Sequence, residues 1–331
     1  MPHRTPLLSI VIPVYNAEKY IAAAIDSIFS QSFTDYELIL VNDGSSDHSL
    51  SILQQYAEMD GRVQVIDQAN QGVVRARQAG LVQACGKYIH YMDADDTLYP
   101  DVYGDLLGKA ESESLDMLFF AFSFDRVDTG MSMLSQPFPT VDVRPETVMK
   151  RCFELDYFAV WQYIHRRSLY DHPYLSDPLI LYGEDLCQTI QLLYYAQKVG
   201  VYDPTTPMLH YRVYGESVSQ SLDFTMQIDN LHRTMHLITT FFDNKPDAAR
   251  FDEALSYYRL RFYAHLVRHG YLDEISKMAA RALSIYMRYP QWQRKHALST
   301  YYKLFRMVDL HPVLGHFFIW RYMQKGKIKR R

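Results

Sequence analysis

The first hundred residues alternate between short apolar runs and segments with the spacing of amphipathic helices. Residues 7–14 have the sequence Leu-Leu-Ser-Ile-Val-Ile-Pro-Val, which is typical of a strand buried on both faces of a parallel sheet. The next apolar residues recur every three or four positions: Tyr20, Ile21, Ala24, Ile25, Ile28 and Phe29. This spacing predicts a helix, so the chain begins with a strand followed directly by a helix.

The same alternation continues along the chain. Further strands are predicted at residues 37–41, 63–66 and 88–92. One helix is expected between the first two of these, capped by Ser46 or Asp47 and ending near Glu58, and another over residues 71–84. Strands alternating with helices at this spacing predict an α/β fold, with a doubly wound, mainly parallel sheet flanked by helices.

Polar residues follow three of the predicted strands: Tyr15-Asn16, Asn42-Asp43-Gly44 and Asp93-Ala94-Asp95-Asp96. Ligands of doubly wound sheets bind outside the carboxyl ends of the strands. Three carboxylates within four residues repel one another unless a cation or a donor-rich ligand neutralises them. The cluster therefore indicates chemistry on a metal-bound anion. The alternative is an Asp-rich turn in which Asp96 or Thr97 caps the helix after Pro100.

The pattern changes beyond about residue 125. A less regular stretch extends to Pro145, and Gly183-Glu184-Asp185 opens a helix. From Leu222 the sequence is almost entirely helical in pattern, with Leu231, Met235, Ile238 and Phe242 on one face. We expect an α/β domain over residues 1–220, which contains the polar clusters at the strand ends, and a helical C-terminal region over residues 221–331.

Charge divides the chain unevenly. Residues 1–128 hold 8 Lys and Arg against 19 Asp and Glu, a net charge of −11, whereas residues 129–331 carry +7. The acidic first part would repel phosphates without a metal, so no nucleic acid is expected as a partner. The 27 tyrosines suit sugar-stacking surfaces but equally suit core packing.

The cysteines and the termini bear on location. Three widely spaced cysteines indicate neither a disulfide framework nor a zinc site, as in a reducing compartment. We expect a cytoplasmic protein, because no signal-peptide segment and no run of eighteen apolar residues occurs. The aromatic residues 317–323 and the basic residues 325–331 resemble an anchor at the inner, anionic face of the cell membrane. The alternative is a solvated, disordered end.

Four strings in this order resemble the family 2 glycosyltransferases of GT-A fold: Ser9-Ile-Val-Ile-Pro-Val-Tyr-Asn16, Val41-Asn-Asp-Gly-Ser-Ser-Asp47, Asn70-Gln-Gly72 with Ala76-Arg77 and Gly80, and Asp93-Ala-Asp-Asp96. The likeness is close over the first hundred residues. It continues more sparsely to Ser219, through Gly183-Glu-Asp185 and His210-Tyr-Arg212. Members of this kind assemble bacterial capsule, lipopolysaccharide or exopolysaccharide.

The resemblance implies a site for a nucleotide sugar, most often UDP-linked. Pro13, Tyr15 and Asn16 would line the nucleotide, and Asp43 would accept a hydrogen bond from the edge of the base. From the residues alone, Asn-Asp-Gly-Ser at 42–45 is also a good turn followed by a cap, and Tyr15 also suits packing. Arg77 belongs either near the nucleotide or in an internal ion pair with the aspartates.

The resemblance also implies a divalent cation, Mn²⁺ or Mg²⁺, which suits hard oxygen ligands. Asp93 and Ala94 would lie at the ribose, while Asp95 would ligate the metal and Asp96 would support the metal site or the sugar. His210 would be a late metal ligand, although a lone histidine among aromatic residues is also typical of packing. Arg212 and Ser217 would reach the diphosphate.

Inversion at the anomeric carbon needs a base to take the proton of the acceptor hydroxyl. The resemblance assigns that role to Asp185, with Glu184 orienting the acceptor; the alternative is that these acids form a helix N-cap. The sequence departs from the family where Trp161 is followed by Gln162 and Tyr163 instead of Asn and Lys. This puts in doubt any contact that the lysine makes.

The sequence thus predicts an inverting, metal-dependent glycosyltransferase acting on a saccharide or lipid-linked saccharide acceptor. Two alternatives stay open. A catalytically silent nucleotide-sugar-binding module would lack the metal and base carboxylates, yet Asp93, Asp95 and Asp185 are present. A sugar nucleotidyltransferase usually carries a Gly-rich basic loop after its first strand, and the residues 13–16 are not such a loop.

Overall fold

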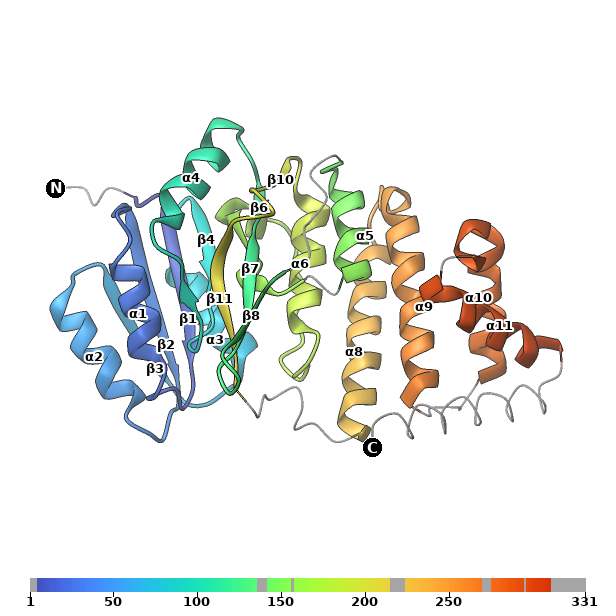
Figure 1. The fold of residues 1–331 in the computed structure, drawn as a ribbon, viewed down its shortest axis with the longest axis horizontal. Helices are drawn as coiled ribbons and strands as arrows, with labels where there is room; N and C mark the ends of the chain where they lie inside the picture. The colour runs from blue at the N-terminus through green and yellow to red at the C-terminus, as the bar shows by residue number, and fades with distance from the viewer. Residues whose placement is uncertain are drawn as a thin grey trace.

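The computed structural model describes residues 5–135, 142–155, 158–214, 224–269, 275–294 and 296–310. A sheet with helices on both faces forms one end of the molecule, and helices of the second half of the chain are stacked toward the other end (Figure 1). The strands are β1 Leu8–Val14, β2 Tyr36–Asp43, β3 Val63–Gln68, β4 Tyr88–Tyr91, β5 Thr97–Leu98, β6 Met117–Phe119, β7 Ala121–Arg126, β8 Met131–Leu134, β9 Tyr163–Arg166, β10 Val199–Val201 and β11 Pro207–Val213. The α-helices are α1 Ile21–Phe29, α2 Ser49–Met59, α3 Val73–Gln83, α4 Val102–Ser112, α5 Pro145–Leu155, α6 Glu184–Tyr195, α8 Phe224–Asp243, α9 Asp252–His269, α10 Ile275–Arg288 and α11 His296–Leu310.

The main sheet has the strand order β10-β6-β9-β4-β1-β2-β3. Strands β1, β2, β3 and β4 are parallel to their neighbours in this group, and β10 is parallel to β6. Strand β9 runs antiparallel to both β4 and β6. A smaller sheet has the order β5-β11-β7-β8. The prediction of a doubly wound, mainly parallel α/β sheet flanked by helices is therefore confirmed.

The four predicted strands of the first hundred residues are all present, within two residues of their expected ends. Strand β1 lies centrally, between β4 and β2, and its pairing with β4 ends at Val11. Pro13 lies beyond that pairing, so its missing N–H interrupts no bond to β4. The carboxyl ends of β1, β2 and β4 meet at one edge of the sheet, as expected.

Two expected helix caps are corrected. Helix α2 begins at Ser49 with His48 in the N-cap position, although Asp47 still accepts the Ser49 N–H through Oδ1 at 2.9 Å. Helix α4 begins at Val102 after Asp101, so neither Asp96 nor Thr97 caps it. Thr97 lies instead in β5, and a turn with a helix cap does not account for the aspartate cluster.

Each face of the main sheet has its own core. On one face, Leu8, Ile10, Ile12 and Val14 of β1 pack with buried residues of α1, α2 and α4. On the other face, Val11 begins a cluster that continues through α3 and α6 into α5 and α8 to α11. Because β1 alternates between the faces, it contributes to both cores. The second core crosses the expected boundary at residue 220, so the division into two domains stays a prediction.

The chain beyond residue 100 contains elements that periodicity did not predict. Strands β6, β9 and β10 have three or four residues each and complete the main sheet. The expected face of α8 is confirmed, because Ile238 and Phe242 are buried and Leu231 and Met235 pack against the same core.

The described helices offer no candidate for a membrane span, since none combines the necessary length with sufficient hydropathy. The segment expected to form a membrane anchor, residues 317–331, lies outside the described residues. Contact with the inner face of the membrane therefore stays a prediction.

Close packing of α3 on the sheet gives a first testable prediction. A Cβ atom at Gly80 would lie 2.3 Å from Cγ1 of Val11, whereas one at Gly104 in α4 would meet open space. Gly80→Ala should therefore destabilise the fold by about 1–3 kcal/mol, because overpacking forces backbone shifts. The matched control Gly104→Ala should stabilise it by about 0.5–1 kcal/mol. Urea midpoints measured by circular dichroism check both, and equal midpoints would contradict the packing argument.

Candidate active site

The aspartate cluster leaves the main sheet directly after β4. Asp93 and Asp95 are partly exposed, and Asp96 is fully buried. Oδ1 of Asp96 accepts the backbone N–H of Arg212 at 2.9 Å. Strand β5 pairs with β11 next to this bond, with Thr97 opposite His210. The smaller sheet thus fixes the cluster at the edge where the carboxyl ends of β1 and β2 also lie.

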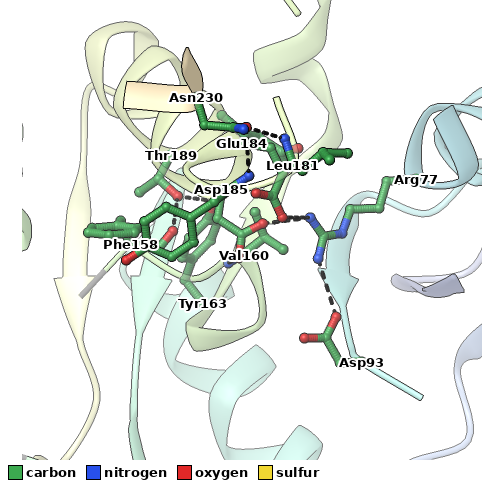
Figure 2. Close-up of polar contacts among 12 residues, drawn as sticks. Arg77, Asp93, Phe158, Val160, Tyr163, Leu181, Glu184, Asp185, Thr189 and Asn230 are labelled. Atoms are coloured by element: carbon green, nitrogen blue, oxygen red, sulfur yellow. Dashed lines mark hydrogen bonds and ion pairs between the residues drawn. The ribbon is translucent and has the colours of Figure 1, made fainter. Parts of the chain in front are cut away.

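Arg77 of α3 is the centre of the site. Its side chain is only 6% exposed, and Nη1 donates to Oδ1 of Asp185 at 2.5 Å. Nη2 donates to Oδ1 of Asp93 at 3.2 Å, and Oε1 of Glu184 lies 3.5 Å from Nη1. Figure 2 shows the guanidinium between these acids. Of the two interpretations of Arg77, the structure has the internal ion pair, and it extends to the acids of α6.

The start of α6 is held by α8. Gly183 occupies the N-cap position with φ +97°, and a Cβ there would lie 2.9 Å from Oγ1 of Thr234. Oδ1 of Asn230 accepts the N–H groups of Leu181 and Tyr182 at 2.6 and 3.1 Å (Figure 2). The helical region therefore fixes the loop before the acids.

Glu184 and Asp185 are not N-caps, which corrects the alternative interpretation of this pair. They lie in the first turn of α6, where the helix dipole favours acids. The second oxygen of Asp185 accepts the Val160 N–H at 3.4 Å. Both oxygens of this carboxylate are thus oriented, one by Arg77 and one by the backbone.

One guanidinium faces more carboxylates than it can neutralise. Burial and the charges of Asp185 and Asp95 raise the pKa of Asp93 to about 6, against the opposing charge of Arg77. Burial and the charge of Asp185 raise the pKa of Glu184 to about 8. Burial also raises the pKa of Asp96 well above its ordinary value. The site therefore favours additional positive charge, whether as protons or as a bound cation.

The residues expected at the nucleotide lie at the ends of β1 and β2. Asp43 is buried, and its carboxylate accepts hydrogen bonds from the Gln68 amide at 2.7 Å and from the N–H groups of Gln71 and Gly72 at 2.9 and 2.8 Å. These bonds tie the loop before α3 to β2. Recognition of a base by Asp43 stays a prediction.

Tyr15 and Asn16 follow β1. The Tyr15 side chain is 55% exposed, so packing does not account for it. Asn16 has φ +49°, and its side-chain oxygen accepts the Ser46 N–H at 2.8 Å. Pro13 is partly exposed beside them. The three residues leave an accessible edge next to Asp43.

His210 has contacts that the sequence did not predict. Its Nδ1 lies 2.5 Å from Oδ2 of Asp125 and 3.2 Å from Oγ of Ser123, and its ring stacks on Tyr99 with centroids 3.7 Å apart. Within the described part of the chain, no three His, Cys, Asp or Glu side chains form a group suited to a metal. The contacts favour a packing role, and a metal-ligand role for His210 stays a prediction.

Three other expectations concern the same region. Arg212 reaches Asp96 through its backbone, and its charge lowers the pKa of Asp96 against the effect of burial. Ser217 lies outside the described residues. Gln162 and Tyr163, where the sequence departs from the family, are buried, and Trp161 before them is buried and stacks on Tyr211 with ring centroids 4.9 Å apart, so this segment belongs to the core.

A family model described as Glycosyl transferase family 2 matches residues 9–175, just over half of the chain. The match covers both the ends of β1 and β2, where the nucleotide is expected, and the aspartate cluster. The chain belongs to glycosyl transferase family 2.

Similar proteins support the family assignment. EpsH of Bacillus subtilis is 35% identical over 222 residues, covering 65% of this chain and 63% of EpsH. EpsJ of the same organism, an uncharacterized glycosyltransferase, is 36% identical over 205 residues, covering 60% of this chain and 59% of EpsJ. The chain therefore spans less than two thirds of the length of these family 2 relatives.

The fold has a counterpart among solved structures. S. aureus TarS 1-349 in complex with UDP-GlcNAc matches with a TM-score of 0.70 and covers 96% of this chain and 92% of that one, at 18% sequence identity. At this identity the likeness shows the fold alone. It extends over the helical region as well as the family 2 portion.

The raised pKa of Glu184 predicts how the stability of this family 2 protein depends on pH. The native state holds a proton that the unfolded state loses above about 4.5, so stability should fall as pH rises from 4.5 to about 8. Glu184→Gln should remove this loss of stability. At pH 8 it should raise the free energy of unfolding by up to a few kcal/mol, and the melting temperature should therefore rise more at pH 8 than at pH 5. Thermal unfolding at both values checks this, and parallel pH profiles would contradict it.

Proposed function

We propose that this chain is an inverting glycosyltransferase that moves a sugar from a nucleotide sugar, a UDP-sugar, to a saccharide or lipid-linked saccharide acceptor. One observation carries the proposal: Arg77 holds Asp93, at the expected ribose and metal side, and Asp185, the expected base, on a single guanidinium. The residues proposed to bind the leaving diphosphate and the residue proposed to deprotonate the acceptor thereby lie next to each other. A silent binding module would have no need for this pairing.

The donor side has the ligand chemistry of a divalent cation. Asp95 is partly exposed, and Oδ2 of Asp96 is buried without a hydrogen-bond partner among the described residues. Carboxylate oxygens suit Mn²⁺ or Mg²⁺, and Mg²⁺ is commonly held by one or two carboxylates with substrate phosphates. Asp95 and Asp96 would hold the ion. Bound there, it would stabilise the negative charge that develops on the leaving diphosphate.

The base side uses residues of α6. Asp185 would take the proton from the acceptor hydroxyl, while Arg77 and the Val160 N–H keep its carboxylate in one orientation. Glu184 would orient the acceptor beside it. This reaction class fits the assembly of a surface polysaccharide. The identities of the donor sugar and the acceptor depend on the shapes of the binding pockets and not on the motifs.

Removal of a metal ligand tests the donor side. UDP-, GDP- and dTDP-sugars screened with Mn²⁺ or Mg²⁺ should show hydrolysis of a UDP-sugar by the wild type. Asp95→Ala should reduce it by about 100-fold, because the cation supplies several kcal/mol of charge stabilisation. Asp105→Asn, which changes an exposed acid of α4, is the control and should leave the rate unchanged. If the wild type binds and hydrolyses no sugar nucleotide, the assignment is wrong.

Removal of the base tests the acceptor side. Asp185→Asn keeps the size of the side chain and should reduce transfer by about 10²–10⁴-fold. Affinity for the donor, measured by calorimetry with UDP, should remain within about threefold, since Asp185 would act on the acceptor. An equal loss of donor affinity and transfer would contradict the base role. Melting temperatures show whether the variant remains folded.

A further inference from the structure

A cavity of about 280 Å³ lies between α5, α6, α8, α9 and α11. None of its lining residues comes from the first 150 residues, so it is separate from the nucleotide edge formed by β1 and β2. The volume is close to the lower limit of about 300 Å³ for pockets that hold small molecules. Such a space suits a monosaccharide or disaccharide.

The cavity borders the acids of α6. Tyr182 and Gly183 line it, and the chain continues from them directly into Glu184 and Asp185. Phe158 also lines the cavity, two residues before Val160, whose N–H binds Asp185. In Figure 2, Phe158 and Val160 lie beside Asp185. The two segments that lead to Asp185 and to its partner Val160 therefore form part of the cavity wall.

The lining combines aromatic rings with fixed polar groups. Seven of its fifteen residues are Phe or Tyr, which offer flat apolar faces to the C–H surface of a sugar. Glu154 and Arg261 bring opposite charges, and each is held by a neighbour: Arg151 donates to Glu154 at 2.6 Å, and Arg261 donates to the Phe153 carbonyl. The lining therefore favours a neutral polar ligand over a lipid chain or an anion.

We propose that this cavity binds a neutral sugar unit of the acceptor. The inference rests on the proposed function and names its acceptor class. Glu184 and Asp185 do not line the cavity, but they follow its wall residues Tyr182 and Gly183 directly, so the cavity adjoins the start of the helix that carries the proposed base. The helical region thus supplies acceptor recognition, while the ends of the parallel strands supply donor recognition.

Binding of simple glycosides to the full chain tests the inference. Methyl β-glycosides of glucose, galactose and N-acetylglucosamine are titrated by saturation-transfer NMR, and at least one should bind the wild type. Ala264→Phe fills the cavity from α9 and should weaken that binding at least about tenfold. Met287→Phe, at a 72% exposed position of α10, is the control and should leave binding unchanged.

A second variant covers the case in which Ala264→Phe unfolds. Tyr182 is 45% exposed at the cavity wall, so Tyr182→Ala removes a ring without opening the core, and it should also weaken binding. 1-Octanol, titrated in the same way, tests for a cavity that binds lipid chains instead. If a UDP-sugar is hydrolysed but no glycoside binds, or if 1-octanol binds and no glycoside does, the inference fails and the proposed function stands. If glycosides bind but no sugar nucleotide is bound or turned over, the proposed function fails, and the acceptor assignment fails with it.

Discussion

The candidate site depends on the buried guanidinium group of Arg77. Arg77 contacts a carboxylate that follows β4 and two carboxylates at the start of α6, which lie more than a hundred residues after Arg77 in the chain. Burial alone would lower the pKa of the guanidinium, but the charges of Asp185, Asp93 and Glu184 outweigh that effect and keep it raised. Removing the guanidinium from this setting would leave three partly buried carboxylates uncompensated, which is destabilising. The pairing therefore joins α3 and the end of β4 to α6 electrostatically.

The same cluster keeps an excess of negative charge beside the nucleotide edge. Asp93, Asp96 and Glu184 all have raised pKa values, chiefly because burial disfavours their charged forms. The fold tolerates this excess of negative charge because separate hydrogen bonds hold each acid in place. Strand β11 binds Asp96, α8 binds the loop before Glu184, and the Val160 N–H binds Asp185. Repulsion between the acids lowers the free energy of unfolding, and binding of a cation or a donor-rich ligand to the folded state raises it again.

Local patterns predicted β1 to β4 because these strands alternate with helices at regular spacing, and β1 and β2 are also long and mostly buried. The short strands β6, β9 and β10 were missed, since three or four residues carry no period and no such regular alternation surrounds these strands. Asn230 and Asp125 were missed for another reason. Each acts on a segment 48 or more residues away, at Leu181 and His210, and nothing in their own neighbourhoods marks that contact.

By itself the sequence determined the α/β fold, and it predicted the edge of the sheet for the ligand and the acids proposed to carry the chemistry, because strand ends and motifs are local features of a chain. The tertiary structure alone decided which acids share Arg77, which aspartate is buried, and that His210 pairs with Asp125. It also decided that five helices enclose a cavity against the loop before Asp185. These outcomes depend on burial and charge between segments far apart in sequence, and both are fixed only when the helices pack on the sheet.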